Sequence, residues 1–432
     1  MRKISKLSLV AAVAVAGFST ANAQPLEEAI KNVEVSGSVV YRYNDYNNDS
    51  NDNAVGQVGQ KNSTTNNNYK IGLNATSKVN DYVKFNSRFL VASETGDFAG
   101  PLNTQDAGDS NVDVELSHAY FGLTAIPNTT VNIGKQGLTT PWTVAIDSDG
   151  NEQTGTGALA LSTVGPVTLA AAYFNQTNLG KSGNILPGLN SKVENNADVV
   201  DAGGVSIGTA LLGDTVNDDF GKKDIITAGI IGELDFVTLD AWYLDMEDVF
   251  DTYSLSAKSD FKFDGGKLGL EAKYVSLDLD NADTDNATAI LIATGNVGIV
   301  NAKVAYAWTD KEGGITALDQ DAKNTLLGWS ITSLGKADAD YWQAVLGVNI
   351  LDNLNLSANY GNIKYTSVYN NTTTAVDVEE EEIYAQLTYK MSKNLNTYIR
   401  YGTYTKEYDK NLGNGKDIND DVRGRLQVEY TF

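Results

Sequence analysis

Along most of the chain, apolar and polar residues alternate in segments of about ten residues. The closing segment, "GRLQVEYTF", shows the pattern most clearly in its apolar positions Leu426, Val428, Tyr430 and Phe432. Such alternation is typical of a β-strand with one apolar face and one wet face. It predicts an all-β fold, and the closing segment taken alone is compatible with a soluble sandwich or with a membrane barrel.

The connections between these segments favour the barrel. Short links are expected near residues 79–82, 125–129, 165, 235, 265, 297, 351–353 and 392–393. Most of the connections between them are long and polar, at 45–67, 93–111, 138–155, 176–221, 310–338, 368–378 and 409–420. Outer-membrane barrels have short periplasmic turns and long outer loops. The sequence therefore predicts a transmembrane antiparallel β-barrel of about 18 strands.

The N-terminal stretch "MRKISKLSLVAAVAVAGFSTANAQ" has the parts of a secretion signal: a basic start, an apolar middle and a small-residue site at Ala21-Asn22-Ala23. A membrane anchor is the alternative, but it requires a longer apolar stretch to span a bilayer. We therefore expect residues 1–23 to be cleaved. Residues 24–432 are then one barrel domain in the bacterial outer membrane, in contact with its lipid.

Charge and composition argue against several classes of function. The chain carries 55 acidic and 32 basic residues, a net charge of −23, so it would repel the phosphates of a nucleic acid. It has no cysteine and one histidine, which removes disulfides, thiolate sites and most histidine chemistry. "GVSIG" fits the nucleophile elbow with Ser206, but that motif needs α/β surroundings and a histidine after the serine, whereas His118 precedes it. We therefore expect that the protein is not an enzyme. We expect His118 to be an interior polar side chain.

Basic residues are expected to line one side of the lumen. The arginines that follow the signal segment all fall on the polar side of a predicted strand: Arg42, Arg88, Arg400, Arg423 and Arg425. Lys84 has the same parity, and Lys135 ends a strand. Since the first, third and last two strands become neighbours on closure, the prediction is one basic wall. The alternative is that these arginines only pair with interior acids and brace the barrel.

An acidic wall is expected opposite, from the third long loop. The stretch "LTTPWTVAIDSDGNEQTGTG" contains Asp147, Asp149 and Glu152. If it folds into the lumen, its carboxylates and the arginines create a transverse field that orients small polar solutes. The alternative is an ordinary outer loop with solvated acids. The acidic run "VEEEEI" (378–383) is interpreted as a solvated edge.

Several stretches together resemble the major outer membrane porins of Campylobacter and its relatives. They are "PLEEAIKNVEVSGSVVYRY" (25–43), "IGKQ" (133–136) with "WT", "ID" and "GTG" after it, "TLAAAYF" (168–174) and the closing "RLQVEYTF". The signal segment is similar too. The match is specific at both ends and around the third loop, and it is loose through the middle of the chain.

The resemblance implies an eighteen-stranded homotrimeric porin for small hydrophilic solutes and ions, with an infolded third loop and Ca²⁺ near the constriction. It places the family's loop carboxylate on Asp147, which is also a candidate for a plain pore-lining acid. The spacing between "ID" and "GTG" is longer here, so the other calcium ligands are not placed. The family's terminal aromatic, read by the barrel-assembly machinery, falls on Phe432.

The sequence thus predicts an outer-membrane porin for passive diffusion, with no required cofactor. Two alternatives stay open. One is a selective porin whose arginines bind a particular anion or sugar acid. The other is a surface adhesin or structural barrel that acts through its outer loops.

Overall fold

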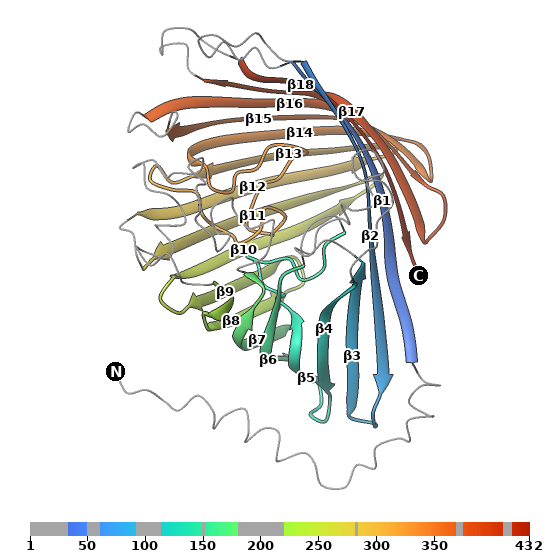
Figure 1. Cartoon of the computed structure of the whole chain (residues 1–432), viewed down its shortest axis with the longest axis vertical. Coiled ribbons are helices and arrows are strands. Elements are labelled where there is room, and N and C mark those ends of the chain that lie inside the picture. Colours follow the sequence, from blue (N-terminus) through green and yellow to red (C-terminus); the bar gives the residue numbers. More distant parts are fainter. Residues whose placement is uncertain are drawn as a thin grey trace.

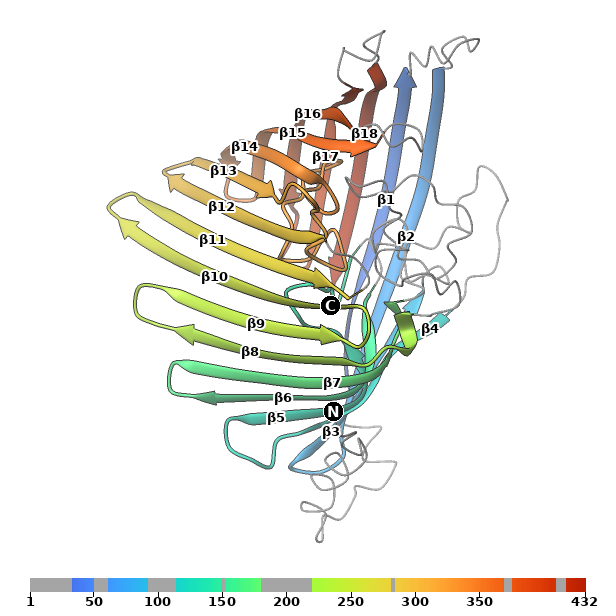
Figure 2. The ribbon, with the colours of Figure 1, turned by 90° about the vertical axis from the view of Figure 1, so that its left-hand side faces the viewer.

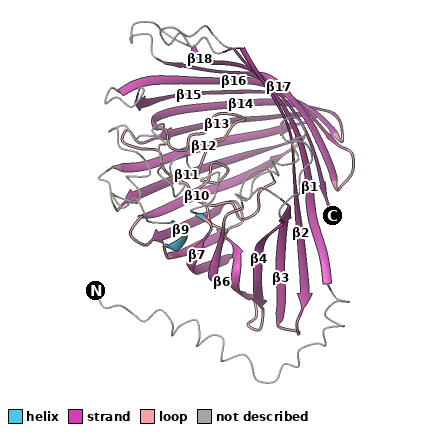
Figure 3. Cartoon of the chain, in the orientation of Figure 1, coloured by secondary structure: helices cyan, strands magenta, loops and turns pink. Residues whose placement is uncertain are grey.

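The fold is a closed β-barrel. The computed structural model describes residues 33–49, 61–91, 114–148, 152–179, 220–280, 284–368, 375–408 and 417–432. These residues form eighteen strands and one short 3-10 turn, η3 (Phe220–Lys222) (Figure 1, Figure 3). The first nine strands are β1 (Val33–Asp49), β2 (Lys61–Lys78), β3 (Val83–Val91), β4 (Val114–Leu123), β5 (Thr129–Gly137), β6 (Thr154–Val164), β7 (Val167–Thr177), β8 (Ile225–Glu233) and β9 (Thr238–Met246). The others are β10 (Phe250–Phe263), β11 (Gly266–Leu279), β12 (Asp285–Val297), β13 (Val300–Thr309), β14 (Ala337–Leu351), β15 (Leu354–Val368), β16 (Ala375–Lys390), β17 (Leu395–Tyr408) and β18 (Asp417–Thr431).

The barrel closes between its first and last strands. Each strand pairs antiparallel with the next, and β1 pairs with both β2 and β18 (Figure 2). In this seam Arg42 lies opposite Gln427, and Phe432 exchanges both backbone hydrogen bonds with Gly37 (2.9 and 3.1 Å). A Cβ on Gly37 would lie 2.3 Å from the Gly72 carbonyl oxygen, so only glycine allows this close approach. The closed all-β barrel confirms the predicted fold class and strand number.

The two ends of the barrel differ as the sequence predicts. All eight predicted short links coincide with links that join β2 to β3, β4 to β5 and so on to β16 and β17. The opposite end carries the long connections. Two links there are exceptions, because β9 and β10 are joined by residues 247–249 alone, and β11 and β12 by residues 280–284. Among the described residues, no helix is long and apolar enough to span a membrane. The expected signal segment 1–23 lies outside the described residues.

The outer face of the barrel is apolar. Tyr401 and Ile399 on β17 are 64% and 55% exposed, whereas Arg400 between them faces inward and is partly buried. The same alternation separates the half-exposed Phe89 from the buried Arg88 on β3. Lipid solvates such an apolar surface, and the closed ladder leaves no strand edge unpaired within it.

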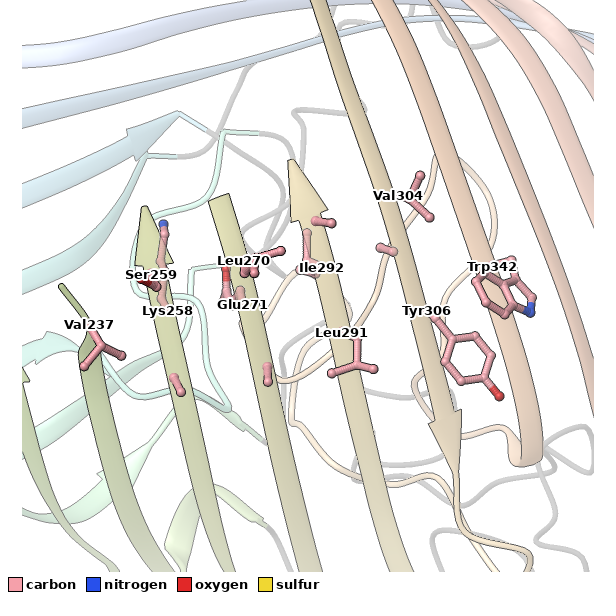
Figure 4. A pocket seen from close by; sticks show the side chains of 14 residues that line it. Val237, Lys258, Ser259, Leu270, Glu271, Leu291, Ile292, Val304, Tyr306 and Trp342 are labelled. Carbon is pink, nitrogen blue, oxygen red and sulfur yellow. The ribbon is translucent and has the colours of Figure 1, made fainter. Parts of the chain in front are cut away.

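The outer face also has a hollow of about 550 Å³ over β10–β14 (Figure 4). Its outward side chains include Leu270, Leu291, Val304 and Trp342. These are apolar groups that lipid chains would cover.

Candidate functional site

The loop between β5 and β6 spans residues 138–153, and its described residues, 138–148 and 152–153, pack against the inner wall of the barrel. Trp142 is fully buried and Leu138 is 1% exposed. They belong to an apolar cluster with inward side chains of β7 to β11, which include Phe174, Ile225, Leu244, Met246, Phe250, Val275 and Leu277. This cluster explains why the loop turns inward. By packing together, the apolar side chains of the loop and of the inner wall remove each other from water in the lumen.

A second loop, residues 310–336 between β13 and β14, completes the same cluster with Ile315, Ala317, Leu318, Ala322 and Leu334 (Figure 1). The two loops are also joined by hydrogen bonds. The Leu318 amide donates to the Trp142 carbonyl (2.8 Å), and the Gln153 side-chain amide donates to the Leu318 carbonyl (2.8 Å). Gln153 is fully buried and also accepts a bond from the Val144 amide (2.9 Å). The two loops therefore form one unit inside the barrel.

Glu152 attaches this unit to the wall at β3. Its carboxylate accepts three hydrogen bonds from Arg88, at 2.5, 2.8 and 3.0 Å, and one from the Ser117 hydroxyl at 2.9 Å. Arg88 also donates to the Asn74 side chain (2.8 Å). Glu152 and Arg88 are 2% and 3% exposed, so water screens this ion pair little. The sequence placed Glu152 on a wall opposite the arginines, but it contacts Arg88 directly.

Lys70 on β2 is a second basic residue at this contact. Its ammonium donates to the Asp147 carbonyl (2.9 Å) and lies 4.0 Å from the Glu152 carboxylate. The lysine is 2% exposed. Lys70 was not predicted, although it has the same parity as Asn66 and Asn68 before it, and this could have indicated an inward position.

Three carboxylates meet where the two loops touch. Oxygens of Asp147, Asp319 and Asp321 all lie within 4.8 Å of one another. Asp147 and Asp319 are buried, and Asp321 is exposed. Ligands about 2.3–2.6 Å from one calcium ion stand at most about 5 Å apart, so this spacing fits a shared ion. The all-oxygen donor set also suits Ca²⁺ better than Zn²⁺. The sequence selected Asp147 alone.

The tip of loop 310–336 is attached to the wall on β16. The Glu382 carboxylate accepts hydrogen bonds from the backbone amides of Trp329 (2.9 Å) and Ser330 (2.7 Å). The Ser330 hydroxyl also accepts a hydrogen bond from Arg423. Glu382 is only 3% exposed, so the interpretation of its acidic run as a solvated edge is wrong at this position.

A second buried acid holds the end of the same loop. Glu380 on β16 contacts the ammonium groups of Lys336 (3.0 Å) and Lys406 (3.5 Å) and the hydroxyls of Tyr365 (2.6 Å) and Tyr404 (3.1 Å). Burial lowers the pKa of Lys336, and the Glu380 carboxylate partly offsets this effect. The solvated-edge interpretation is therefore also wrong for Glu380, which is 2% exposed.

The remaining arginines form a continuous inner surface on β1, β17 and β18. Arg42 donates to the Gln427 side chain (2.8 Å), and Arg423 pairs with Asp421 (2.5 Å). Arg400 and Arg425 are directly opposite each other on β17 and β18. The structure thus brings together arginines that the sequence assigned to neighbouring strands.

The two predicted lysines lie apart from this surface, and only Lys84 agrees with a lumen position. Lys84 has the same parity on β3 as the inward Arg88, and it is exposed near the start of the strand. Lys135 follows Ile133 by two positions, and Ile133 lies opposite Phe121, whose side chain is 48% exposed on the outer face. The register therefore places Lys135 on the outer face, where its ammonium donates to the Leu116 carbonyl (2.7 Å). Lys135 lies within β5, which ends at Gly137, so the alternation along the strand still holds there. The predicted lumen position of Lys135 is therefore wrong.

Of the other residues singled out in the sequence, Asp149 and Ser206 lie outside the described residues. His118 faces inward on β4 and is 8% exposed. It borders a polar cavity of about 330 Å³ between the wall and loop 138–148, together with Asn74, Arg88 and Gln136. This is an interior polar position, as the sequence predicts.

Comparison with solved structures places the fold among outer-membrane porins. Pseudomonas aeruginosa OpdQ is similar, with 16% sequence identity, a TM-score of 0.63, and coverage of 92% of this chain and 98% of that chain. A BenF-like porin from Pseudomonas fluorescens Pf-5 has 14% identity, a TM-score of 0.65 and the same coverage. Acinetobacter baumannii OccAB3 has 12% identity and a TM-score of 0.64, and the match covers 92% and 99%. At these identities the likeness shows the fold alone.

No curated protein sequence matches this chain. A family model does match, over all of its residues, and it agrees with the barrel described above. The chain belongs to the Campylobacter major outer membrane protein family, whose model covers residues 1–432.

Proposed function

We propose that this outer-membrane porin is a passive diffusion channel for ions and small hydrophilic solutes, narrowed by loops 138–153 and 310–336. The observation that carries the proposal is the attachment of the joined loops to the wall through the buried contact of Glu152 with Arg88. A second attachment, through Glu382, holds the tip of loop 310–336. Because both attachments are buried, the loops are held in the lumen and narrow it without a moving gate.

Planar-bilayer recording of the purified protein in a KCl gradient tests this function. We expect ohmic steps without a threshold voltage, because the loop contacts described above need no movement for solutes to pass. Silent membranes with folded protein would contradict the channel and would favour a surface protein that acts through its outer loops.

The same proposal includes assembly. We propose a homotrimer that is exported with a cleaved segment 1–23 and recognised by the barrel-assembly machinery through Phe432. The resemblance to the porin family supports all three points. Phe432 also directly follows the last residue of β18 and is 42% exposed, so an assembly factor could reach it. Conductance steps that recur in threes would support the trimer, and single uniform steps would count against it.

We further propose that Ca²⁺ binds Asp147, Asp319 and Asp321 and joins the two loops. One carboxylate comes from loop 138–153 and two from loop 310–336, so an ion would link them and offset the repulsion between three close negative charges. The channel would pass solutes with or without calcium. The bound ion would make the narrowed region more rigid.

The prediction for calcium concerns the variant Asp319→Asn. Calorimetric titration of the detergent-solubilised protein with CaCl₂ should show binding to the unmodified chain that weakens by about tenfold or more in the variant, because a charged ligand is lost. Asp310→Asn is the matched control, since Asp310 lies at the start of the same loop and accepts a bond from the Glu312 amide instead. Equal calcium affinities for the unmodified chain and Asp319→Asn would contradict the site.

A further inference from the structure

Two arginines lie side by side on the inner wall, and neither forms an ion pair with an acid among the described residues. Arg400 on β17 and Arg425 on β18 are directly opposite each other in the register. Opposite residues in an antiparallel pair have Cβ atoms about 5 Å apart, and like charges at that distance destabilise the sheet. Both side chains are partly exposed on the inner face.

The hydrogen-bond partners of these two arginines are neutral. Arg400 donates through Nε to the Gln386 side chain (2.8 Å). Arg425 donates to the Asn44 side chain (2.8 Å) and to the Tyr46 hydroxyl (2.9 Å). Within the described part of the chain, neither has a carboxylate within the 4.0 Å of an ion pair. Neutral partners orient the two guanidinium groups without neutralising them.

Two acids on the same part of the wall, Glu382 and Asp421, bond to other groups. Glu382 accepts the amides of loop 310–336, and Asp421 pairs with Arg423 (2.5 Å). Arg400, Arg423 and Arg425 thus bring three positive charges against these two carboxylates, and Arg42 on β1 adds a fourth. Excess positive charge therefore remains at the pair formed by Arg400 and Arg425.

Aromatic rings hold the pair in place. The guanidinium carbons of Arg400 and Arg425 lie 5.1 and 5.6 Å from the centre of the Trp329 ring. Arg400 also lies 4.8 Å from the Tyr384 ring and 5.1 Å from the Tyr398 ring. Contact with aromatic rings holds a guanidinium group in one orientation. The group therefore loses little conformational freedom when it binds an anion.

We propose that Arg400 and Arg425 form a binding subsite in the lumen for a small organic carboxylate. A carboxylate offers two oxygens to two fixed guanidinium forks, which is the geometry of the strongest charge-assisted hydrogen bonds. It also supplies the negative charge that the cluster lacks. The inference rests on the proposed function in one respect, since solutes must reach the lumen.

The test uses benzoate and its neutral counterpart benzamide as probes. Calorimetry with the detergent-solubilised full chain should show saturable binding of benzoate and none of benzamide. Arg400→Gln and Arg425→Gln should each weaken benzoate binding by at least about tenfold, as expected for the loss of a charge-assisted bond. Lys303→Gln is the matched control, because it removes one inward positive charge that hydrogen-bonds to Gln343 on another part of the wall (3.0 Å).

The variant Arg400→Lys separates fork geometry from charge. It should weaken benzoate binding although the charge is kept, and equal affinities for the variant and the unmodified chain would overturn the proposal. Equal binding of benzoate and benzamide would also overturn it. Normal KCl currents without benzoate binding refute the subsite and leave the channel intact, whereas benzoate binding with silent membranes refutes the channel and supports the subsite.

Discussion

Replacing Glu152 with Gln is expected to release loop 138–153 from the wall and to raise the single-channel conductance. The substitution removes the charge that Arg88 and Lys70 face, and it leaves two cations buried at 3% and 2% exposure. Removing one partner of a buried ion pair costs about 3–5 kcal/mol. Since the joined loops narrow the lumen, their displacement should produce larger and noisier current steps in planar bilayers.

Two further variants make this result specific. Asp81→Asn is the matched control, because Asp81 pairs with Lys78 (2.7 Å) on an exposed short link far from the two loops. Its conductance should equal that of the unmodified chain. The double variant Arg88→Gln with Glu152→Gln should restore part of the lost attachment, since two amides can bond to each other and one buried charge is gone. Unchanged conductance in Glu152→Gln would mean that this contact does not control the width of the lumen.

Trp142→Ala is the second large expected effect. The indole is fully buried in the cluster shared by the two loops and the inner wall, and truncation of a buried Trp costs about 3–5 kcal/mol. We expect the two loops to separate and the chain at Lys323, in loop 310–336, to become cleavable by trypsin, because the side chain of Lys323 is exposed but its neighbours Ala322 and Asn324 are buried. Cleavage there should accelerate by about a hundredfold or more, because each 1.4 kcal/mol changes the open population about tenfold.

The control for this variant is Phe236→Ala. Phe236 is also aromatic, but it lies on a short link and is 72% exposed, so its truncation should leave the cleavage rate unchanged. Similar rates for Trp142→Ala and the unmodified chain would contradict the apolar cluster as the basis of loop attachment.

The fold could be predicted because it depends on local patterns. Alternation along a strand decides which side chains face lipid, and this correctly separated Arg88 from Phe89 and Arg400 from Tyr401. Short links could be located because they interrupt the alternation. The links 247–249 and 280–284 were missed, since such short connections at the long-loop end leave little polar sequence to mark them.

The site was less predictable because it depends on contacts between segments far apart in the sequence. Asp319 meets Asp147 only when two loops pack together, and Glu382 is buried only because loop 310–336 lies over it. One local signal was available. That loop contains Ile315, Leu318, Trp329 and other large apolar residues that a solvated outer loop would not need.

The central claim is that the two loops narrow a water-filled lumen, and polymer exclusion tests it most directly. Single-channel conductance would be recorded in KCl with neutral polyethylene glycols of increasing size, for the unmodified chain and for Trp142→Ala. We predict that the unmodified chain excludes polymers that enter the variant and lower its current, because an eighteen-stranded barrel is wider than its narrowed part. The same size limit in both proteins would contradict the account.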